Sequence, residues 1–162
     1  MRRPAGLVSI HRIVRRGYSV ILMATARWEL YSHPADIGIR GLGPTREAAF
    51  EQAALALTAV ITELEKVEPK QAVDIECRED DDELLFFCWL NSLLYEMGTR
   101  AMLFSRFEVQ AVAGGIRAKA WGEPVDVVRH EPAVEVKAAT YADLRVGQGR
   151  DGNWTAQCIV DV

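Results

Sequence analysis

The chain has 162 residues, 49% hydrophobic and 26% charged, a composition typical of one globular domain with a core of its own. Its charge is uneven. Residues 1–22 hold five arginines and no acid, whereas residues 23–162 hold 14 basic and 23 acidic residues, a net charge of −9. An acidic body argues against broad binding to a phosphate backbone and is compatible with a cation site or a basic protein partner.

The first 22 residues form an appendage with no clear periodicity. Three interpretations stay open: a mitochondrial transit peptide, a disordered basic arm, or sequence upstream of a true start at Met23. The third is favoured, because the ordered pattern begins only at about Arg27. We therefore expect an N-terminal extension over 1–22, disordered or not part of the native chain, and a folded domain over 23–162. The longest apolar stretch near this end is too short to span a membrane.

The folded part opens with two short strands and a helix. Strands are predicted at Trp28–Tyr31 and Ile37–Leu42, on either side of the segment His33-Pro34-Ala35-Asp36. Thr45 is a plausible N-cap without a full capping box. Apolar residues then recur at helical spacing and predict one buried stripe: Phe50, Ala53, Leu57, Val60, Ile61 and Leu64.

A strand is predicted at Gln71–Arg78, followed by a second helix over 84–97. The acidic run 79–83 complements the positive end of the helix dipole, and Gly98 is a candidate for the C-cap. Residues 84–90 are apolar all round, so this helix is expected to be central. Trp89 and Tyr95 are both expected in the core.

The third part of the chain predicts a hairpin and three further strands. Strands at 106–112 and 116–121 flank Gly114-Gly115, read as a two-residue turn. With that turn Val109 opposes Ala120 and Ala111 opposes Ala118. Further strands are expected at 134–138, 143–146 and 154–162, with a polar turn at 147–153. Strands and helices mix without regular alternation, so we predict an α+β fold: a single domain with mixed or antiparallel sheets packed on two main helices.

Two isolated acids and the chain end form the first candidate site. Asp36 lies between two predicted strands, and the last strand runs apolar up to Asp161 and the free carboxylate of Val162. Docked in a sheet, these carboxylates would suit a hard cation such as Ca²⁺ or Mg²⁺. Spacing alone does not bring them together, and each acid could equally be solvated at a strand end.

Histidines and a charged pair give weaker candidates. His33 and His130 could act as a metal-binding or catalytic pair, although isolated histidines near loops are more often ordinary hydrogen-bonding residues. Glu135 and Lys137 would share one face of a strand. They form a solvated pair by default, and Lys137 could also contact a phosphate or an acidic partner.

The cysteines do not indicate a zinc site, because they show no CxxC spacing and no nearby histidine pair. Buried free thiols in a reducing compartment are the simpler interpretation, which favours a cytoplasmic protein. The three thiols belong to Cys77, Cys88 and Cys158.

Four blocks of residues, in order, resemble the archease family, the small proteins that activate the GTP-dependent tRNA-splicing RNA ligase. The resemblance covers about residues 27–162. It rests on the segment from His33 to Ile39, the helix segment from Phe86 to Tyr95, Gly122-Glu123 with His130 and the segment from Glu135 to Tyr141, and the terminal segment from Trp154 to Val162. The chain departs from the usual family pattern at Pro34, Tyr141-Ala142 and Val160. The Ala142 change puts a role for a histidine there in doubt.

The resemblance implies a site and a function. It implies that Asp36, Asp161 and the C-terminal residue Val162 bind a divalent cation, typically Ca²⁺, and that Lys137 takes part in activation. It further implies that the chain promotes guanylylation and multiple turnover of a GTP-dependent RNA ligase, in tRNA splicing or RNA repair. On this interpretation the chain is not itself an enzyme, contacts RNA only indirectly and does not associate with a membrane.

Two other functions stay open from the residues. An RNA-binding or RNA-chaperone module is disfavoured by the acidic body unless residues 1–22 are a functional arm. A metal-dependent hydrolase would use His33 or His130 as a base near the cation.

Overall fold

The structure is a computed structural model that describes residues 25–162. The predictions for residues 1–22 and for a start at Met23 lie outside the described residues. The elements in chain order are β1 (Arg27–His33), β2 (Asp36–Gly43), α1 (Arg46–Ile61), the 3₁₀ turn η1 (Leu64–Lys66), β3 (Gln71–Arg78), α2 (Asp82–Arg100), β4 (Met102–Val112), β5 (Gly115–Pro124), α3 (Val127–His130), β6 (Ala138–Ala139), β7 (Arg145–Gln148) and β8 (Trp154–Asp161).

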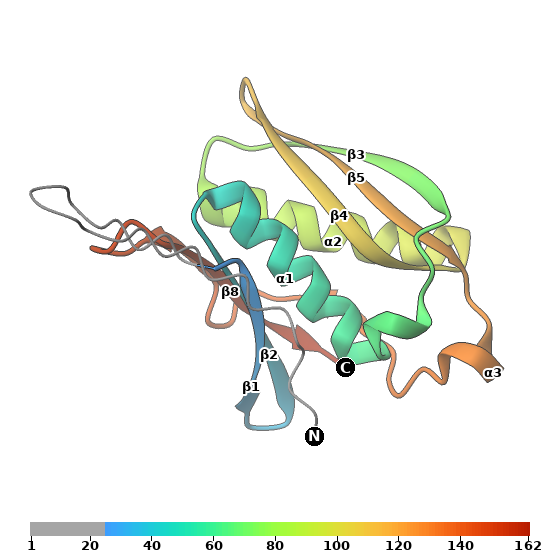
Figure 1. Cartoon of the computed structure of the whole chain (residues 1–162). Coiled ribbons are helices and arrows are strands. Elements are labelled where there is room, and N and C mark those ends of the chain that lie inside the picture. The colour runs from blue at the N-terminus through green and yellow to red at the C-terminus, as the bar shows by residue number, and fades with distance from the viewer. Residues whose placement is uncertain (1–24) are drawn as a thin grey trace, which may run out of the picture.

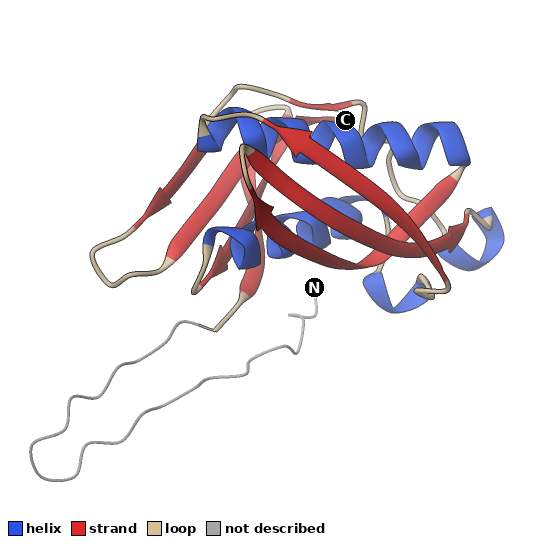
Figure 2. Ribbon diagram, turned by 90° about the horizontal axis from the view of Figure 1, so that it is seen from above, coloured by secondary structure: helices blue, strands red, loops and turns tan. Residues whose placement is uncertain are grey.

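Two antiparallel sheets enclose the two long helices (Figure 1). The first sheet has the order β1-β2-β8-β6, and β7 also pairs with β8. The second has the order β3-β5-β4 and, seen from above in Figure 2, crosses over α1 and α2. All strand pairs of the described residues are antiparallel. The predicted α+β class, with two main helices and antiparallel sheets, is confirmed.

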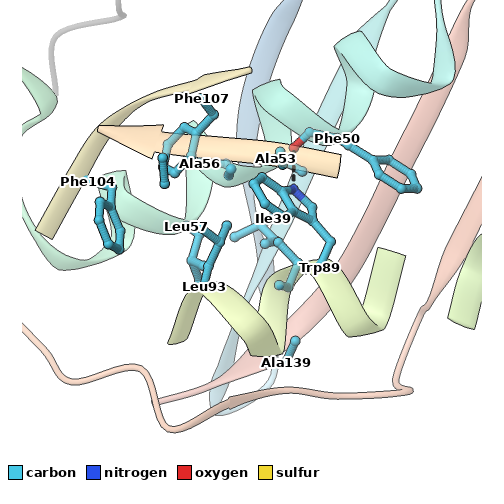
Figure 3. Packing of buried hydrophobic residues seen from close by; sticks show 14 of the residues in the cluster. Ile39, Phe50, Ala53, Ala56, Leu57, Trp89, Leu93, Phe104, Phe107 and Ala139 are labelled. Atoms are coloured by element: carbon cyan, nitrogen blue, oxygen red, sulfur yellow. Dashed lines mark hydrogen bonds between the residues drawn. The ribbon is translucent and has the colours of Figure 1, made fainter. Parts of the chain in front are cut away.

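The core lies where the two helices face each other between the sheets (Figure 3). Trp89, Phe50 and Phe104 are fully buried. The indole Nε1 of Trp89 donates to the backbone oxygen of Phe50 at 3.0 Å, so the one polar atom of the ring is satisfied. The prediction that Trp89 lies in the core is confirmed. The same prediction for Tyr95 is wrong, because Tyr95 is 67% exposed on the outer face of α2.

The helix starts follow the predicted caps, whereas the end of α2 does not. The Thr45 hydroxyl accepts from the backbone nitrogen of Ala48 at 3.0 Å, and Asp81 accepts from that of Leu84 at 2.9 Å. The helix α2 continues past Gly98 to Arg100 and ends where Ala101 adopts φ 51°. The prediction of a C-cap at Gly98 is therefore wrong.

The β4–β5 hairpin has the predicted faces in a different register. The connecting residues are 113 and 114, with Gly114 at φ 75°, and Gly115 already pairs with Val112. Val109 therefore opposes Ala118, not Ala120. A shift by two residues keeps every side chain on its own face, because the strand period is two.

The segment after α3 contains less strand than predicted. The strand predicted at 134–138 is wrong, because only Ala138–Ala139 pairs with β8. The irregular segment before this pair is bound to the end of α1 instead, because the backbone nitrogen of Ala133 donates to the backbone oxygen of Ile61 at 2.8 Å. The strand predicted at 143–146 lies at Arg145–Gln148, because Asp143 adopts φ 51° and cannot continue a strand.

No helix within residues 25–162 is long and apolar enough to cross a membrane.

Candidate functional site

The candidate site lies at one end of the five-stranded sheet, where the chain terminus meets the β1–β2 turn. Across that turn His33 pairs with Asp36, and β2 pairs with β8 up to Ile37 opposite Val160. One further step in this register sets Asp36 opposite Asp161. Opposed residues of neighbouring strands have Cα atoms roughly 4.5–5.5 Å apart. The topology thus brings together two acids that lie far apart in sequence.

The two aspartates share one face of the sheet. Opposed residues in a register point to the same side, and successive residues alternate. Ile37 and Val160 pack toward the core, so Asp36 and Asp161 face outward. Asp161 is exposed and Asp36 partly so. The Val162 side chain packs against the core, which anchors the terminal carboxylate directly after Asp161.

The three carboxylates have no cationic partner within the protein. Across residues 25–162, no Lys, Arg or His forms an ion pair with Asp36, Asp161 or the terminal carboxylate. Uncompensated negative charges on adjacent strands repel each other, and a cation between them would relieve that repulsion. The carboxylates therefore form a group of negative charge with no positive partner among the described residues.

Lys137 lies on the other side of the chain end. Its backbone nitrogen donates to the Asp161 oxygen at 2.8 Å, and Ala138 pairs with Asp161. The Lys137 side chain is exposed and, within the described part of the chain, makes no ion pair. The structure therefore places Asp36, Asp161, Val162 and Lys137 in one neighbourhood, with the ammonium group of Lys137 free to meet a partner.

Two accessory candidates lie beside this group, and within the described residues neither of their side chains forms a hydrogen bond with it. His33 closes the β1–β2 turn opposite Asp36 and is exposed. Glu135 is exposed in the irregular segment before β6. The predicted strand face shared by Glu135 and Lys137 does not exist, because the strand begins only at Ala138.

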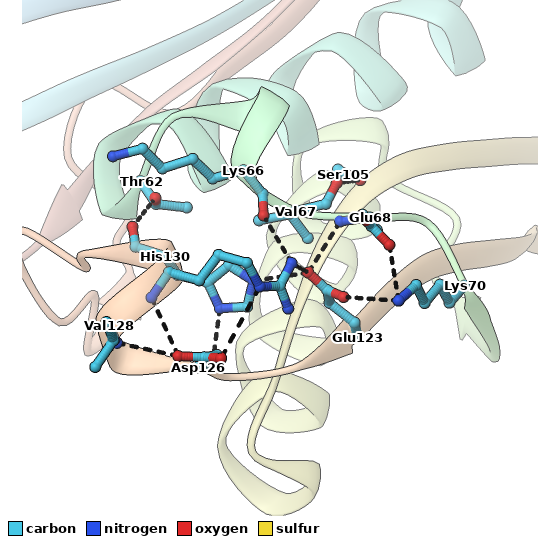
Figure 4. Close-up of polar contacts among 11 residues, drawn as sticks. Thr62, Lys66, Val67, Glu68, Lys70, Ser105, Glu123, Asp126, Val128 and His130 are labelled. Atoms are coloured by element: carbon cyan, nitrogen blue, oxygen red, sulfur yellow. Dashed lines mark hydrogen bonds and ion pairs between the residues drawn. The ribbon is translucent and has the colours of Figure 1, made fainter.

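His130 belongs to a separate, buried network (Figure 4). It is completely buried; its Nδ1 accepts from the Asp126 nitrogen, and its Nε2 lies 2.8 Å from Glu123 Oε1. Glu123 also accepts from Arg129 at 2.5 Å and from the backbone of Glu68 at 3.1 Å. These bonds, that from Arg129 foremost, lower the pKa of Glu123 to about 2. Both ring nitrogens of His130 are engaged, so it is not available as a base.

Asn91 is a residue of the site that sequence reasoning missed. From α2, its Oδ1 accepts from the Ala139 nitrogen at 3.1 Å, and its Nδ2 donates to the Ala139 oxygen at 3.4 Å. This amide ties β6, and with it Lys137, to the central helix. The available signal was a lone amide within an otherwise apolar helix segment.

A second polar group supports the outer face of the sheet. The Tyr31 ring lies over Gly38, where a Cβ atom would overlap it. The Tyr31 hydroxyl and Gln157 Nε2 each donate to Asp143 Oδ2 at 2.9 Å. Burial, together with the Asp143 carboxylate, raises the pKa of Tyr31, so the phenol stays protonated and can donate. This group holds the 140–144 segment against β8, beside the aspartates.

The cysteines behave as expected for packed thiols. All three are free. Burial raises the pKa of Cys77 and of Cys158 to about 12, which makes both unreactive at neutral pH. Cys88 is only partly buried.

The donors at the sheet end fit a hard divalent cation. Within the described residues no three side chains of the types His, Cys, Asp and Glu cluster around a common point. A cation held by Asp36 and Asp161 would therefore need the Val162 carboxylate as a third anionic ligand. Three carboxylates are the donor type that Ca²⁺ prefers.

Comparison with known proteins agrees with this architecture. The model of the Archease protein family (MTH1598/TM1083) matches residues 28–162. The chain is 44% identical over 140 residues to protein archease of Pyrococcus furiosus and 43% identical over 140 residues to that of Thermococcus gammatolerans. Both alignments cover 84% of this chain and 99% of the relative.

A solved structure shares the fold as well. The solution structure of Methanobacterium thermoautotrophicum protein 1598 superposes with a TM-score of 0.73 at 32% identity, covering 83% of this chain and 98% of that one. The family match spans both sheets, both long helices and the chain terminus. The chain belongs to the archease family.

Proposed function

We propose that this chain is a metal-binding activator of a GTP-dependent RNA ligase, acting in tRNA splicing or RNA repair. It promotes guanylylation of the ligase and its multiple turnover, and the nucleotidyl transfer itself belongs to the ligase. Family membership supports the activator role in RNA processing. The group of carboxylates at the end of the sheet, beside the exposed Lys137, supports the more specific role.

The observation that carries the proposal is the register of β2 on β8. It sets Asp36 opposite Asp161, one residue before the terminal carboxylate. Bidentate binding by all three carboxylates would supply about six oxygens, and Ca²⁺ takes roughly six to eight. Water, a backbone carbonyl or the ligase would complete the shell. Asp36, Asp161 and Val162 are thus the proposed ligands.

A bound divalent cation would neutralise the repelling carboxylates and hold the chain end against the β1–β2 turn. Lys137, whose backbone is bonded to Asp161, would then present its ammonium group beside an ordered chain terminus. Both the cation and Lys137 would face the ligase from one edge of the sheet. An acidic body also favours encounter with a basic RNA-binding surface.

The transfer of labelled GMP from GTP to the ligase tests this proposal. The chain should accelerate labelling of the ligase at limiting concentration. Asp36→Asn, Asp161→Asn and Lys137→Ala should each slow it about tenfold, as expected from losing one charged contact of ~1.4 kcal/mol. Glu108→Gln, an exposed acid on β4, is the matched control and should act like the unmodified chain. Equal labelling with and without the chain would refute the proposal.

A further inference from the structure

The strand β3 leaves one edge of the three-stranded sheet open. It pairs with β5 on one side and, across the described residues, with no strand on the other. Figure 1 shows it as the outermost strand, above α2. Its residues alternate between buried, as at Ile75, and exposed, as at Asp74 and Glu76. Such an edge presents unpaired backbone groups that another extended chain can bind.

A hollow of about 410 Å³ runs along this open edge. One wall is β3 itself, at residues 74–76. The other is a single stripe of α2, made of residues at helical spacing: Cys88, Asn91, Ser92, Tyr95 and Glu96. The sheet stops at β3, so this stripe is only partly covered: Tyr95 is 67% exposed, and the other four residues are partly buried. One more strand beside β3 would cover it.

The charges along the edge indicate what such a strand would carry. Asp74 and Glu76 are two residues apart and therefore on one face. Lys119 contacts Asp74 at 3.3 Å, and Arg78 contacts Glu76. Both ion pairs are exposed at the surface, where such pairs contribute little to the free energy of unfolding. The acidic side chains can therefore pair with other basic groups at little cost. The acidic run 79–83 continues directly from the end of β3.

We infer that this edge binds an extended segment of a partner protein, which adds to the sheet beside β3 and carries Lys or Arg at alternate positions. The basic side chains would lie opposite Asp74 and Glu76, where opposite charges on neighbouring strands attract. The intervening side chains would point to the α2 stripe and should be small and apolar. The inference goes beyond the proposed function: Asn91 borders both places, but the inference uses neither the proposed cation ligands nor Lys137.

Charged residues on an edge strand can also serve only to prevent aggregation. That role alone requires no hollow beside the strand and no exposed aromatic residue in it. Here Asp74, Glu76 and Tyr95 border the same 410 Å³ space. A free backbone edge, a hollow beside it and acidic residues at alternate positions of the strand together favour a bound peptide.

A synthetic peptide tests the inference directly. The probe is an eight-residue peptide, acetylated and amidated, that alternates Val with Lys or Arg, titrated into the full chain and followed by amide NMR shifts. The shifts should be confined to β3 and the outer face of α2. Two isomers N-methylated on opposite edges of the peptide test the pairing: one should lose binding and the other keep it.

Matched variants separate this site from general charge attraction. Asp74→Lys together with Glu76→Lys should weaken binding at least tenfold and leave the circular dichroism spectrum unchanged, because both residues are exposed. Glu108→Lys, on the opposite edge strand β4, should bind the probe like the unmodified chain. Equal loss in both variants, shifts spread over the whole surface, or no binding at millimolar peptide would each overturn the inference.

Discussion

Asn91 on α2 holds Ala139 of β6 by both of its backbone groups. The amide oxygen accepts from the Ala139 nitrogen at 3.1 Å, and the amide nitrogen donates to the Ala139 oxygen at 3.4 Å. An amide side chain thus replaces the strand neighbour that β6 lacks on this side. Two residues earlier, Lys137 is held by Asp161. The central helix and the chain terminus together position the segment proposed to meet the ligase.

Replacing Asn91 should therefore reduce ligase activation. We expect Asn91→Ala to lower the free energy of unfolding by about 1.5–4.5 kcal/mol, from three lost hydrogen bonds, two with Ala139 and one to the Phe87 oxygen, at ~0.5–1.5 kcal/mol each. Activation should fall further than stability explains, because β6 loses its anchor. Urea denaturation combined with a ligation assay below the unfolding transition measures both effects. Full activation by a folded Asn91→Ala variant would show that β6 needs no anchor.

Two glycine substitutions should change the free energy of unfolding in opposite directions. Gly98 lies inside α2 with no atom near its Cβ position. Gly98→Ala should therefore raise the free energy of unfolding by about 0.5–1 kcal/mol. A Cβ at Gly41 would overlap the backbone of Ala49 and Ala53 on α1. Gly41→Ala should lower stability by about 3 kcal/mol. Thermal unfolding checks both, and a destabilised Gly98→Ala would restore Gly98 as the C-cap.

The Glu123 network predicts a pH dependence of stability. Its pKa is about 2 in the folded chain, held down chiefly by Arg129, against about 4.3 when unfolded. Because the folded pKa is depressed, the stabilisation is complete above about pH 4.3 and disappears as the pH falls toward 2. The stability difference between the unmodified chain and Glu123→Gln should shrink across this window. Urea denaturation from pH 6 to 2.5 measures it, and a constant difference would exclude the linkage.

The terminal carboxylate should be a calcium ligand. Adding residues after Val162 converts this group to an amide and removes a charge, so calcium affinity should fall. Asp36→Asn and Asp161→Asn should act in the same direction, by at least tenfold each, since each removes one anionic ligand from three. Calorimetric titration measures the affinity, with Glu108→Gln as the control. An extended chain that binds calcium as before would exclude ligation by the terminus.

The sequence predicts an element correctly where the residues of that element alone determine its limits. Strand β3 has the predicted limits, and Thr45 caps α1, because alternation and capping chemistry act over a few residues. The hairpin register was wrong by two residues because both registers bury the same faces. The short strand β6 was misplaced because its position depends on Asn91, a partner distant in sequence.

The site itself could be predicted only in part. The sequence shows two isolated acids at strand ends, Asp36 and Asp161, and the terminal carboxylate of Val162, but no spacing rule brings β2 beside β8. That neighbourhood results from the sheet topology. His130 looked like a candidate base because the sequence does not show that Glu123 and Asp126 occupy both ring nitrogens.

The most direct measurement of the central claim is product formed per ligase molecule, with limiting ligase, GTP, Mn²⁺ and RNA ends. A substoichiometric amount of this chain should carry the ligase from one turnover to many. Lys137→Ala and Asp161→Asn should reduce that gain without unfolding the domain. A ligase that stops after one turnover in the presence of the unmodified chain would contradict the proposed function.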